Sequence, residues 1–327
     1  MTLIVAELSG NHNGSLERML ALIRAAKSAG ADAVKFQTYT ADTLTMKSNH
    51  PCFIIRGGPW AGRTYYNLYQ DAATPWEWYK PMISECKRVH IKWFSTPFDR
   101  TAVDFLESLR CPIYKVSSFD VTDHQLLDYI ASKNKPVIMS TGKCTNAEIV
   151  SAIKSFAYVP KLTLLHCISE YPADIKTMYM QKMNMLRNMF NGDIGLSDHS
   201  LSNLPSVVAT SLGANVIEKH LCLSRKDGGP DSKFSTEPYE FARLVADIRD
   251  VESMFSYKLK DEINVIYRKS LFATKDILYG KRLTRSNTKL CRPCVGIPAD
   301  KAHAAIGKKV KVQVLRVGNP ILWGDLA

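Results

Sequence analysis

The chain has 327 residues, of which 46% are hydrophobic and 23% charged, as expected of a folded globular protein. Its length exceeds what a single hydrophobic core normally supports, so we expect one large domain and a smaller module. No run approaches the ~20 apolar residues of a membrane span, and the amino-terminal apolar run is too short for a signal peptide. We therefore expect a soluble, cytoplasmic protein that does not bind membranes.

Positive charge is concentrated near the carboxyl terminus. The formal net charge is +12, and residues 260–327 contribute +9 of it, with 14 Lys and Arg against 5 Asp and Glu. Basic and apolar residues alternate from Lys308 to Val312, which is typical of the solvent-facing side of a small β module. An anionic substrate or an acidic partner surface explains this charge as well as nucleic acid does, and we expect no nucleic-acid partner.

The eight cysteines lack the spacing of a disulfide framework, which indicates reduced thiols. Cys291 and Cys294 form a C-x-x-C pair, but Pro293 lies between them and no second pair exists elsewhere. A zinc site is therefore not expected.

Residues 1–255 repeat one unit, consisting of a short β-branched run, a polar residue at its end and an amphipathic helix. In the first helix Ser15 is a suitable N-cap and Gly30 a suitable stop. The predicted strands span residues 3–7, 33–37, 92–95, 112–117, 136–140, 162–167, 193–197 and 215–220. Eight such units predict an α/β fold, a closed (β/α)8 TIM barrel over residues 1–255.

After the barrel we expect a linker at 256–265 and a compact all-β module at 266–327. Short β runs in this module, such as 270–273 and 308–315, are separated by Gly and Pro. The second barrel unit carries a long loop from Tyr39 to Thr74 that is rich in aromatic residues, including Trp60. Such a loop is typical of a lid or pocket wall, with an oligomer contact as the alternative.

Polar side chains stand at the carboxyl ends of the predicted strands, which meet at one mouth of a barrel, where ligands bind. They include Glu7, Lys35, Gln37, Thr96, Lys115, Ser118, Asp120, Ser140, His166, Ser169, His199 and His220. The Lys, Ser and Thr side chains suit a small molecule that carries phosphate and carboxylate. Two neutral imidazoles can hold a divalent metal, although a lone histidine is more often a hydrogen-bonded core residue.

A barrel lysine can instead form a Schiff base in a metal-independent aldolase. Lys35, Lys115 and Lys219 are the candidates, and alternation along the strand points Lys219 away from the face of Glu218 and His220. An imine-forming aldolase has no need of two histidines on neighbouring strands. The metal hypothesis is therefore favoured over the imine.

Several motifs in one order resemble the sialic acid synthase family. They are the segments 6–14 (AELSGNHNG), 30–37 (GADAVKFQ), 195–199 (GLSDH) and 217–220 (IEKH). The likeness continues through Arg292, Pro293 and Gly296, which resemble the family's antifreeze-like (SAF, β-clip) domain. It covers nearly the whole chain.

The resemblance implies condensation of phosphoenolpyruvate with an N-acylated amino sugar, assisted by Mn²⁺ or Mg²⁺, in a homodimer. It implies phosphoenolpyruvate binding by Lys35, Thr96, Lys115, Ser118, Ser140 and Ser197, and metal binding by His199 and His220. It implies sugar binding by Gln37, Tyr171, Asp231 and, from the partner's SAF domain, Arg292. Glu7 and Asp120 would be the catalytic carboxylates.

Within the family, the segments 68–78, 94–99, 118–119 and 169–172 resemble the pseudaminic acid branch, whose sugar is 2,4-diacetamido-2,4,6-trideoxy-altrose. A sugar without a terminal hydroxyl would suit a more aromatic pocket. The alternatives are neuraminate or legionaminate synthesis from another N-acyl hexose, a sugar-binding protein that has lost turnover, and a polyanion-binding protein that uses the basic tail.

Asp120 departs from the family pattern, which has Glu at this position. The resemblance assigns this carboxylate to the proton or water at carbon 2 of the enol, and Asp is one methylene shorter. The alternative is that Asp120 caps the following helix beside Thr122 and Asp123.

Overall fold

The computed structural model describes residues 1–256 and 264–327. It divides the chain into two units, Met1–Tyr257 and Lys258–Ala327. The predicted linker at 256–265 falls largely outside the described residues.

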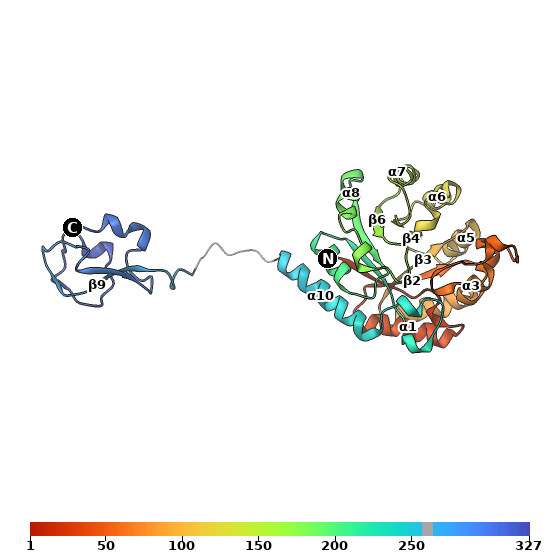
Figure 1. Cartoon of the computed structure of the whole chain (residues 1–327), viewed down its shortest axis with the longest axis horizontal. Coiled ribbons are helices and arrows are strands. Elements are labelled where there is room, and N and C mark those ends of the chain that lie inside the picture. The colour runs from red at the N-terminus through yellow and green to blue at the C-terminus, as the bar shows by residue number, and fades with distance from the viewer. Residues whose placement is uncertain (257–263) are drawn as a thin grey trace. The chain divides into compact units, whose positions relative to one another are not determined.

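The first unit is a closed barrel of parallel strands, as predicted (Figure 1). The strands are β1 (Leu3–Glu7), β2 (Ala33–Thr38), β3 (Lys92–Pro97), β4 (Tyr114–Val116), β5 (Val137–Ser140), β6 (Leu162–Cys167), β7 (Asp193–Asp198) and β8 (Val216–His220). They follow chain order around the barrel, and β8 closes it on β1 with Leu3 opposite Val216.

Helices follow the strands. The longer ones are α1 (Leu16–Ser28), α4 (Tyr79–Arg88), α5 (Arg100–Ser108), α6 (His124–Ala131), α7 (Asn146–Ser155), α8 (Lys182–Met189), α9 (Leu204–Ser211) and α10 (Pro238–Ser256). The predicted start of α1 is correct, because Ser15 accepts a hydrogen bond from the Arg18 amide. The helix ends before Gly30, whose φ of 89° is the left-handed conformation that glycine tolerates.

The predicted strands begin and end within about two residues of the observed ones, because each observed strand is a short and largely buried run. Strand β4 is shorter than predicted at its start, where Pro112 has no N–H to donate to the sheet. The long loop after β2 contains two helices that the sequence did not predict, α2 (Ala41–Leu44) and α3 (Tyr65–Ala72), capped by Thr40 and Thr64.

The second unit contains β9 (Ser270–Ala273), β10 (Ile277–Leu278), β11 (Thr288–Cys291) and β12 (Val314–Leu315), paired as two antiparallel ladders. Of the predicted run 308–315 only β12 is a strand. Leu278 pairs with Val314, and Arg282 bridges Lys309. The segment from Lys309 to Val314 is therefore one residue longer than the segment from Leu278 to Arg282 opposite it, and a bulge interrupts the ladder.

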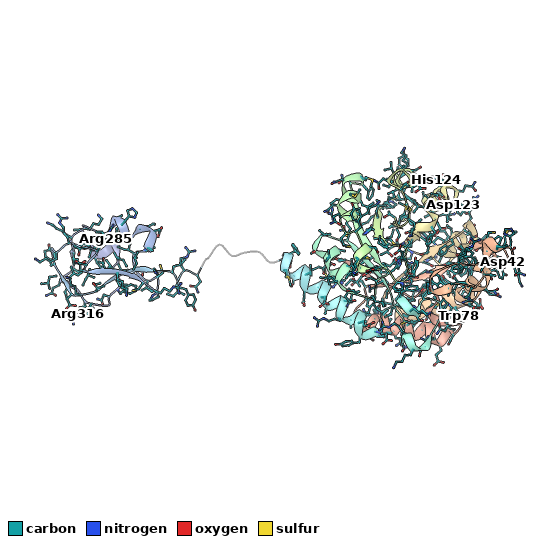
Figure 2. The ribbon with its side chains drawn as sticks, in the orientation of Figure 1. Asp42, Trp78, Asp123, His124, Arg285 and Arg316 are labelled. Carbon is teal, nitrogen blue, oxygen red and sulfur yellow. The ribbon has the colours of Figure 1, made fainter. Side chains whose placement is uncertain are left out.

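The second unit has its own hydrophobic core, which includes Leu271, Leu283, Val310 and Ile321. Its basic side chains, among them Arg285 and Arg316, are drawn in Figure 2. Across residues 1–256 and 264–327, no helix has both the length and the apolar character that crossing a membrane requires.

Candidate active site at the carboxyl ends of the barrel strands

Two carboxylates enclose a lysine in the barrel interior. Lys35 Nζ lies 2.7 Å from Glu7 Oε2 and 3.6 Å from Glu218 Oε1, and all three side chains are buried. Lys35 also donates to Thr96 Oγ1 at 3.2 Å, and Gln37 Nε2 donates to Glu7 Oε1 at 2.9 Å. The structure thus brings together four residues that were predicted for the site, namely Glu7, Lys35, Gln37 and Thr96.

The two carboxylates differ in proton affinity. Burial raises the pKa of Glu7 to about 7, an effect that the charge of Lys35 only partly offsets. Burial acts in the same direction on Glu218, but the charges of Lys35 and Lys115 outweigh it and hold the pKa of Glu218 below its usual value. Glu7 can therefore exchange a proton near neutral pH while Glu218 stays ionised.

A second buried lysine lies among hydroxyl groups. Lys115 Nζ donates to Ser140 Oγ at 2.7 Å and to the Val116 carbonyl at 2.9 Å. The Gly142 amide donates to Ser118 Oγ at 2.9 Å, and a Cβ on Gly142 would lie 2.2 Å from Ser169 Oγ. An ammonium group that donates to a serine hydroxyl, in a barrel whose neighbouring strand ends carry further hydroxyls, is suited to an anion.

Ser197 adds a further hydroxyl to this interior and donates to Glu218 Oε1 at 3.2 Å. Burial lowers the pKa of Lys115, against the opposing charge of Glu218. A bound anion would favour the charged ammonium form of this lysine.

His199 and His220 lie side by side at the ends of β7 and β8, with ring centroids 5.4 Å apart. His199 Nδ1 is 2.9 Å from the Ile168 carbonyl, so it carries the proton, and His220 Nδ1 is 3.1 Å from Ser9 Oγ. These contacts occupy the Nδ1 side of each ring and leave Nε2 for a ligand. Burial, followed by the neighbouring His199, lowers the pKa of His220 well below its usual value and keeps that ring neutral.

The two imidazoles fit a divalent metal that completes its coordination with water and substrate. In residues 1–256 and 264–327 there is no group of three or more His, Cys, Asp or Glu that could hold a metal ion by itself. His166, also at a strand end, bonds the Met178 carbonyl at 2.6 Å and is a hydrogen-bonded core histidine.

Aromatic rings line the two histidines. Tyr171 lies 4.4 Å from His199 and Phe234 lies 5.0 Å from His220, measured between ring centroids. Trp60, from the long loop, contacts Tyr171 at 5.5 Å and Phe234 at 6.0 Å, and its Nε1 donates to the Pro230 carbonyl at 2.7 Å. The loop therefore contributes an aromatic side chain to the group of rings beside the two histidines, and Phe234 is a member of that group that the sequence analysis missed.

The two aspartates of the predicted site differ in their surroundings. Asp231 Oδ2 accepts a hydrogen bond from the Gly10 amide at 3.3 Å, and burial raises the pKa of Asp231. Burial also raises the pKa of Asp120, to about 6, and the Asp120 Oδ2 atom is buried without a hydrogen-bond partner.

The alternative role of Asp120 as a helix cap is wrong. Asp123 is the N-cap of α6 and accepts the Leu126 amide at 3.1 Å, and it is labelled beside His124 in Figure 2. Asp120 instead ends a short 3₁₀ turn, Ser118–Asp120, next to the Lys115 interior. Arg292 belongs to the second unit, where it directly follows β11.

Comparisons with known proteins identify the family of this chain. The NeuB family model matches residues 22–260, and the SAF domain model matches residues 268–327. The chain belongs to the NeuB family. It is 40% identical to the pseudaminic acid synthase of Campylobacter jejuni over 98% of this chain and 96% of that protein.

A further relative and a solved structure are also similar to this chain. An N,N'-diacetyllegionaminic acid synthase of the same bacterium is 36% identical over 94% of this chain and 95% of its own length. The crystal structure of N-acetylneuraminic acid synthetase from Leptospira borgpetersenii is 28% identical, with a TM-score of 0.72 over 80% of this chain and 87% of that one.

Proposed function

We propose that this NeuB-family enzyme condenses phosphoenolpyruvate with 2,4-diacetamido-2,4,6-trideoxy-altrose to give pseudaminic acid and phosphate. The observation that carries the proposal is the buried interior of Lys35 and Lys115 in the barrel whose strands β7 and β8 end in two neighbouring histidines held through Nδ1. The 40% identity to a pseudaminic acid synthase supports the choice of branch.

The reaction needs an anion cradle, an electrophile activator and a proton carrier. Carbon 3 of the enol attacks the sugar aldehyde, forming a carbon–carbon bond while the aldehyde oxygen takes up a proton. Water then adds to carbon 2 and loses a proton, and the carbon–oxygen bond to phosphate breaks to release phosphate and the keto acid. Charge develops at carbon 2 and at the aldehyde oxygen, so preorganised groups around both centres lower the barrier.

Lys35, Thr96, Lys115, Ser118, Ser140 and Ser197 bind phosphoenolpyruvate in this proposal. The two ammonium groups neutralise its phosphate and carboxylate, and the hydroxyl groups orient it. Because this interior is buried, each of these interactions is stronger than it would be in water.

His199 and His220 would hold Mn²⁺ or Mg²⁺, which when bound supplies Lewis-acid polarisation of the aldehyde. Glu7, with a pKa of about 7, and Asp120, with a pKa of about 6, are the groups able to give or take the protons. The free Oδ2 of Asp120 is available to a water molecule.

Gln37, Tyr171 and Asp231 orient the sugar in this proposal, at the side of the mouth that holds the aromatic wall. Trp60 and Phe234 add apolar surface to that wall. A trideoxy sugar ends in a methyl group, which gains from apolar contact where a hydroxymethyl group would lose its hydrogen bonds with water.

The SAF unit completes the site from a second copy of the chain in this proposal, with Arg292 reaching the sugar. Arg292→Ala should raise the KM for the sugar and leave the KM for phosphoenolpyruvate unchanged. Mixing Arg292→Ala chains with His220→Ala chains should restore activity, because one site in each mixed dimer is intact. No recovery under conditions where subunits exchange would remove the cross-subunit role.

Phosphate release from phosphoenolpyruvate, measured over a panel of N-acyl sugars, tests the function. We expect the highest kcat/KM with the altrose derivative, and lower values with N-acetylmannosamine and with the sugar precursor of legionaminic acid. Preference for either of these would move the enzyme to another branch. No phosphate release with any of them would favour a sugar-binding protein without turnover.

A further inference from the structure

Asp198 and Lys219 directly precede the two histidines of the site, and they form an ion pair of their own. Strands β7 and β8 align them opposite each other, and Lys219 Nζ lies 2.8 Å from Asp198 Oδ2. The side chain of Lys219 is 1% exposed and that of Asp198 is 0% exposed. Alternation along the strands turns this pair away from the interior that Ser197 shares with Glu218, as expected for Lys219.

The pair holds the backbone that follows His199. Lys219 Nζ also donates to the Ser200 carbonyl at 2.6 Å and to the Ser202 carbonyl at 3.1 Å. Asp198 Oδ1 accepts the Ser200 amide at 2.9 Å, a contact that spans His199 itself. Asp198 Oδ2 accepts the Ser206 hydroxyl of α9 at 2.7 Å.

These contacts use the three protons of the ammonium group and both oxygens of the carboxylate. An apolar pair of similar volume would fill the space between β7, β8 and α9, but it would make no bond to the carbonyls of Ser200 and Ser202. The ionic pair therefore does something that packing alone does not, because it fixes the chain on both sides of His199 and ties it to the strand that ends in His220.

We propose that the Asp198–Lys219 pair positions His199 relative to His220 and thereby sets the affinity for the divalent cation. The inference rests on the proposed function, in which these two imidazoles are the only protein ligands. With so few ligands, a shift of one ring is not compensated by others, so binding depends strongly on how well the rings are preorganised.

Lys219→Met and Asp198→Asn keep the volume of each side chain and remove the ion pair. Mn²⁺ binding to the full-length protein without substrates, followed by the electron paramagnetic resonance signal of free Mn²⁺, should weaken by about 10–100-fold in either variant. Excess Mn²⁺ should restore part of the lost kcat. Arg249→Met is the matched control, because it breaks the ion pair with Asp32 before β2 and should leave Mn²⁺ affinity unchanged.

If Lys219→Met does not fold, Ser206→Ala takes its place, because it removes one hydrogen bond to Asp198 Oδ2 and should weaken Mn²⁺ binding severalfold. The folded variants could instead bind Mn²⁺ as tightly as the wild-type protein and show only lowered melting temperatures, as Arg249→Met does. The pair would then be purely structural, and this inference would be overturned while the proposed function would stand. Failure of the wild-type protein to bind Mn²⁺ would overturn the proposed metal role as well.

Discussion

Buried polar side chains differ in hydrogen bonding between the two ends of the barrel. At the carboxyl ends of the strands, buried side-chain oxygens of Asn11, Asp120 and Glu218 have no hydrogen-bond partner. At the amino ends, Arg249 binds both Asp32, at 2.7 Å, and Glu252, at 2.8 Å. Among the described residues, no buried side-chain N or O atom without a partner lies in a loop that leads into a strand.

This difference distinguishes polar groups at the amino ends, which stabilise the fold, from polar groups at the carboxyl ends, which are available to bind a ligand. A buried polar atom without a partner costs free energy, so the carboxyl ends give up stability that the amino ends retain. Bound ligands, metal or ordered water can recover that cost. The same division between a stable face and a catalytic face is general for TIM barrels.

Removing metal should produce the largest effect, because in the proposed function the cation held by His199 and His220 activates the sugar aldehyde. We expect a chelator to abolish phosphate release, a loss of at least ~10³-fold, and Mn²⁺ or Mg²⁺ to restore it. The ion pairs at the amino ends do not involve the metal and should be unaffected. Activity that survives the chelator, together with borohydride trapping of pyruvate on Lys35 or Lys115, would replace the metal mechanism with an imine.

Asp120→Asn tests whether a carboxylate at the carboxyl ends of the strands contributes to catalysis rather than to stability. We expect kcat to fall by ~10²–10⁴, the usual contribution of a positioned general acid or base. Asp120→Glu should retain or raise kcat, because it restores the longer reach of the family's carboxylate. Near-normal kcat in Asp120→Asn would remove Asp120 from the mechanism.

The difference in stability between Asp120→Asn and the wild-type protein should depend on pH. The pKa of Asp120 is raised by burial from 3.8 to about 6, so the folded state keeps a proton that the unfolded state releases. The wild-type protein therefore loses stability as pH rises from about 4 to 6, and the cost is complete above pH 6. At pH 8 the variant should have a free energy of unfolding higher by about 1–3 kcal/mol, and at pH 3.5 it should show no such gain. Urea unfolding at both pH values measures this difference.

The contrast also explains how much the sequence predicts. All eight strands were predicted because each is a short and largely buried run, and a polar residue at the end of such a run lies at the barrel mouth. The meeting of Glu7, Lys35 and Lys115 follows from that rule alone.

Contacts that depend on loop conformation were not predictable. Trp60 reaches Tyr171 only because its loop is bonded to the Pro230 carbonyl, about 170 residues away in sequence. Asp120 and Asp123 are both reasonable caps in the sequence, and only the helix start decides between them. The Asp198–Lys219 pair requires the register of β7 on β8.

Trp60→Ala tests whether the loop contributes to the catalytic end. We expect the KM for the sugar to rise about 10-fold, since an aromatic contact is worth roughly 1–1.5 kcal/mol, with the KM for phosphoenolpyruvate unchanged. Tyr65→Ala is the control, because Tyr65 stacks on Tyr69 in the same loop and has no contact with the histidines. Equal KM values for the sugar in Trp60→Ala and Tyr65→Ala would show that the loop does not form the sugar pocket.

The smallest effect on activity is expected at the amino ends. Arg249→Met removes the bonds to Asp32, Glu252 and the Thr2 carbonyl, which join α10 to the starts of β1 and β2. Because these groups are only partly buried, we expect the free energy of unfolding to fall by about 1–2 kcal/mol. The values of kcat and KM should match those of the wild-type protein, measured well below the melting temperature. A change in KM for either substrate would mean that the two ends are coupled, and the division between a stabilising face and a catalytic face would then not hold for this barrel.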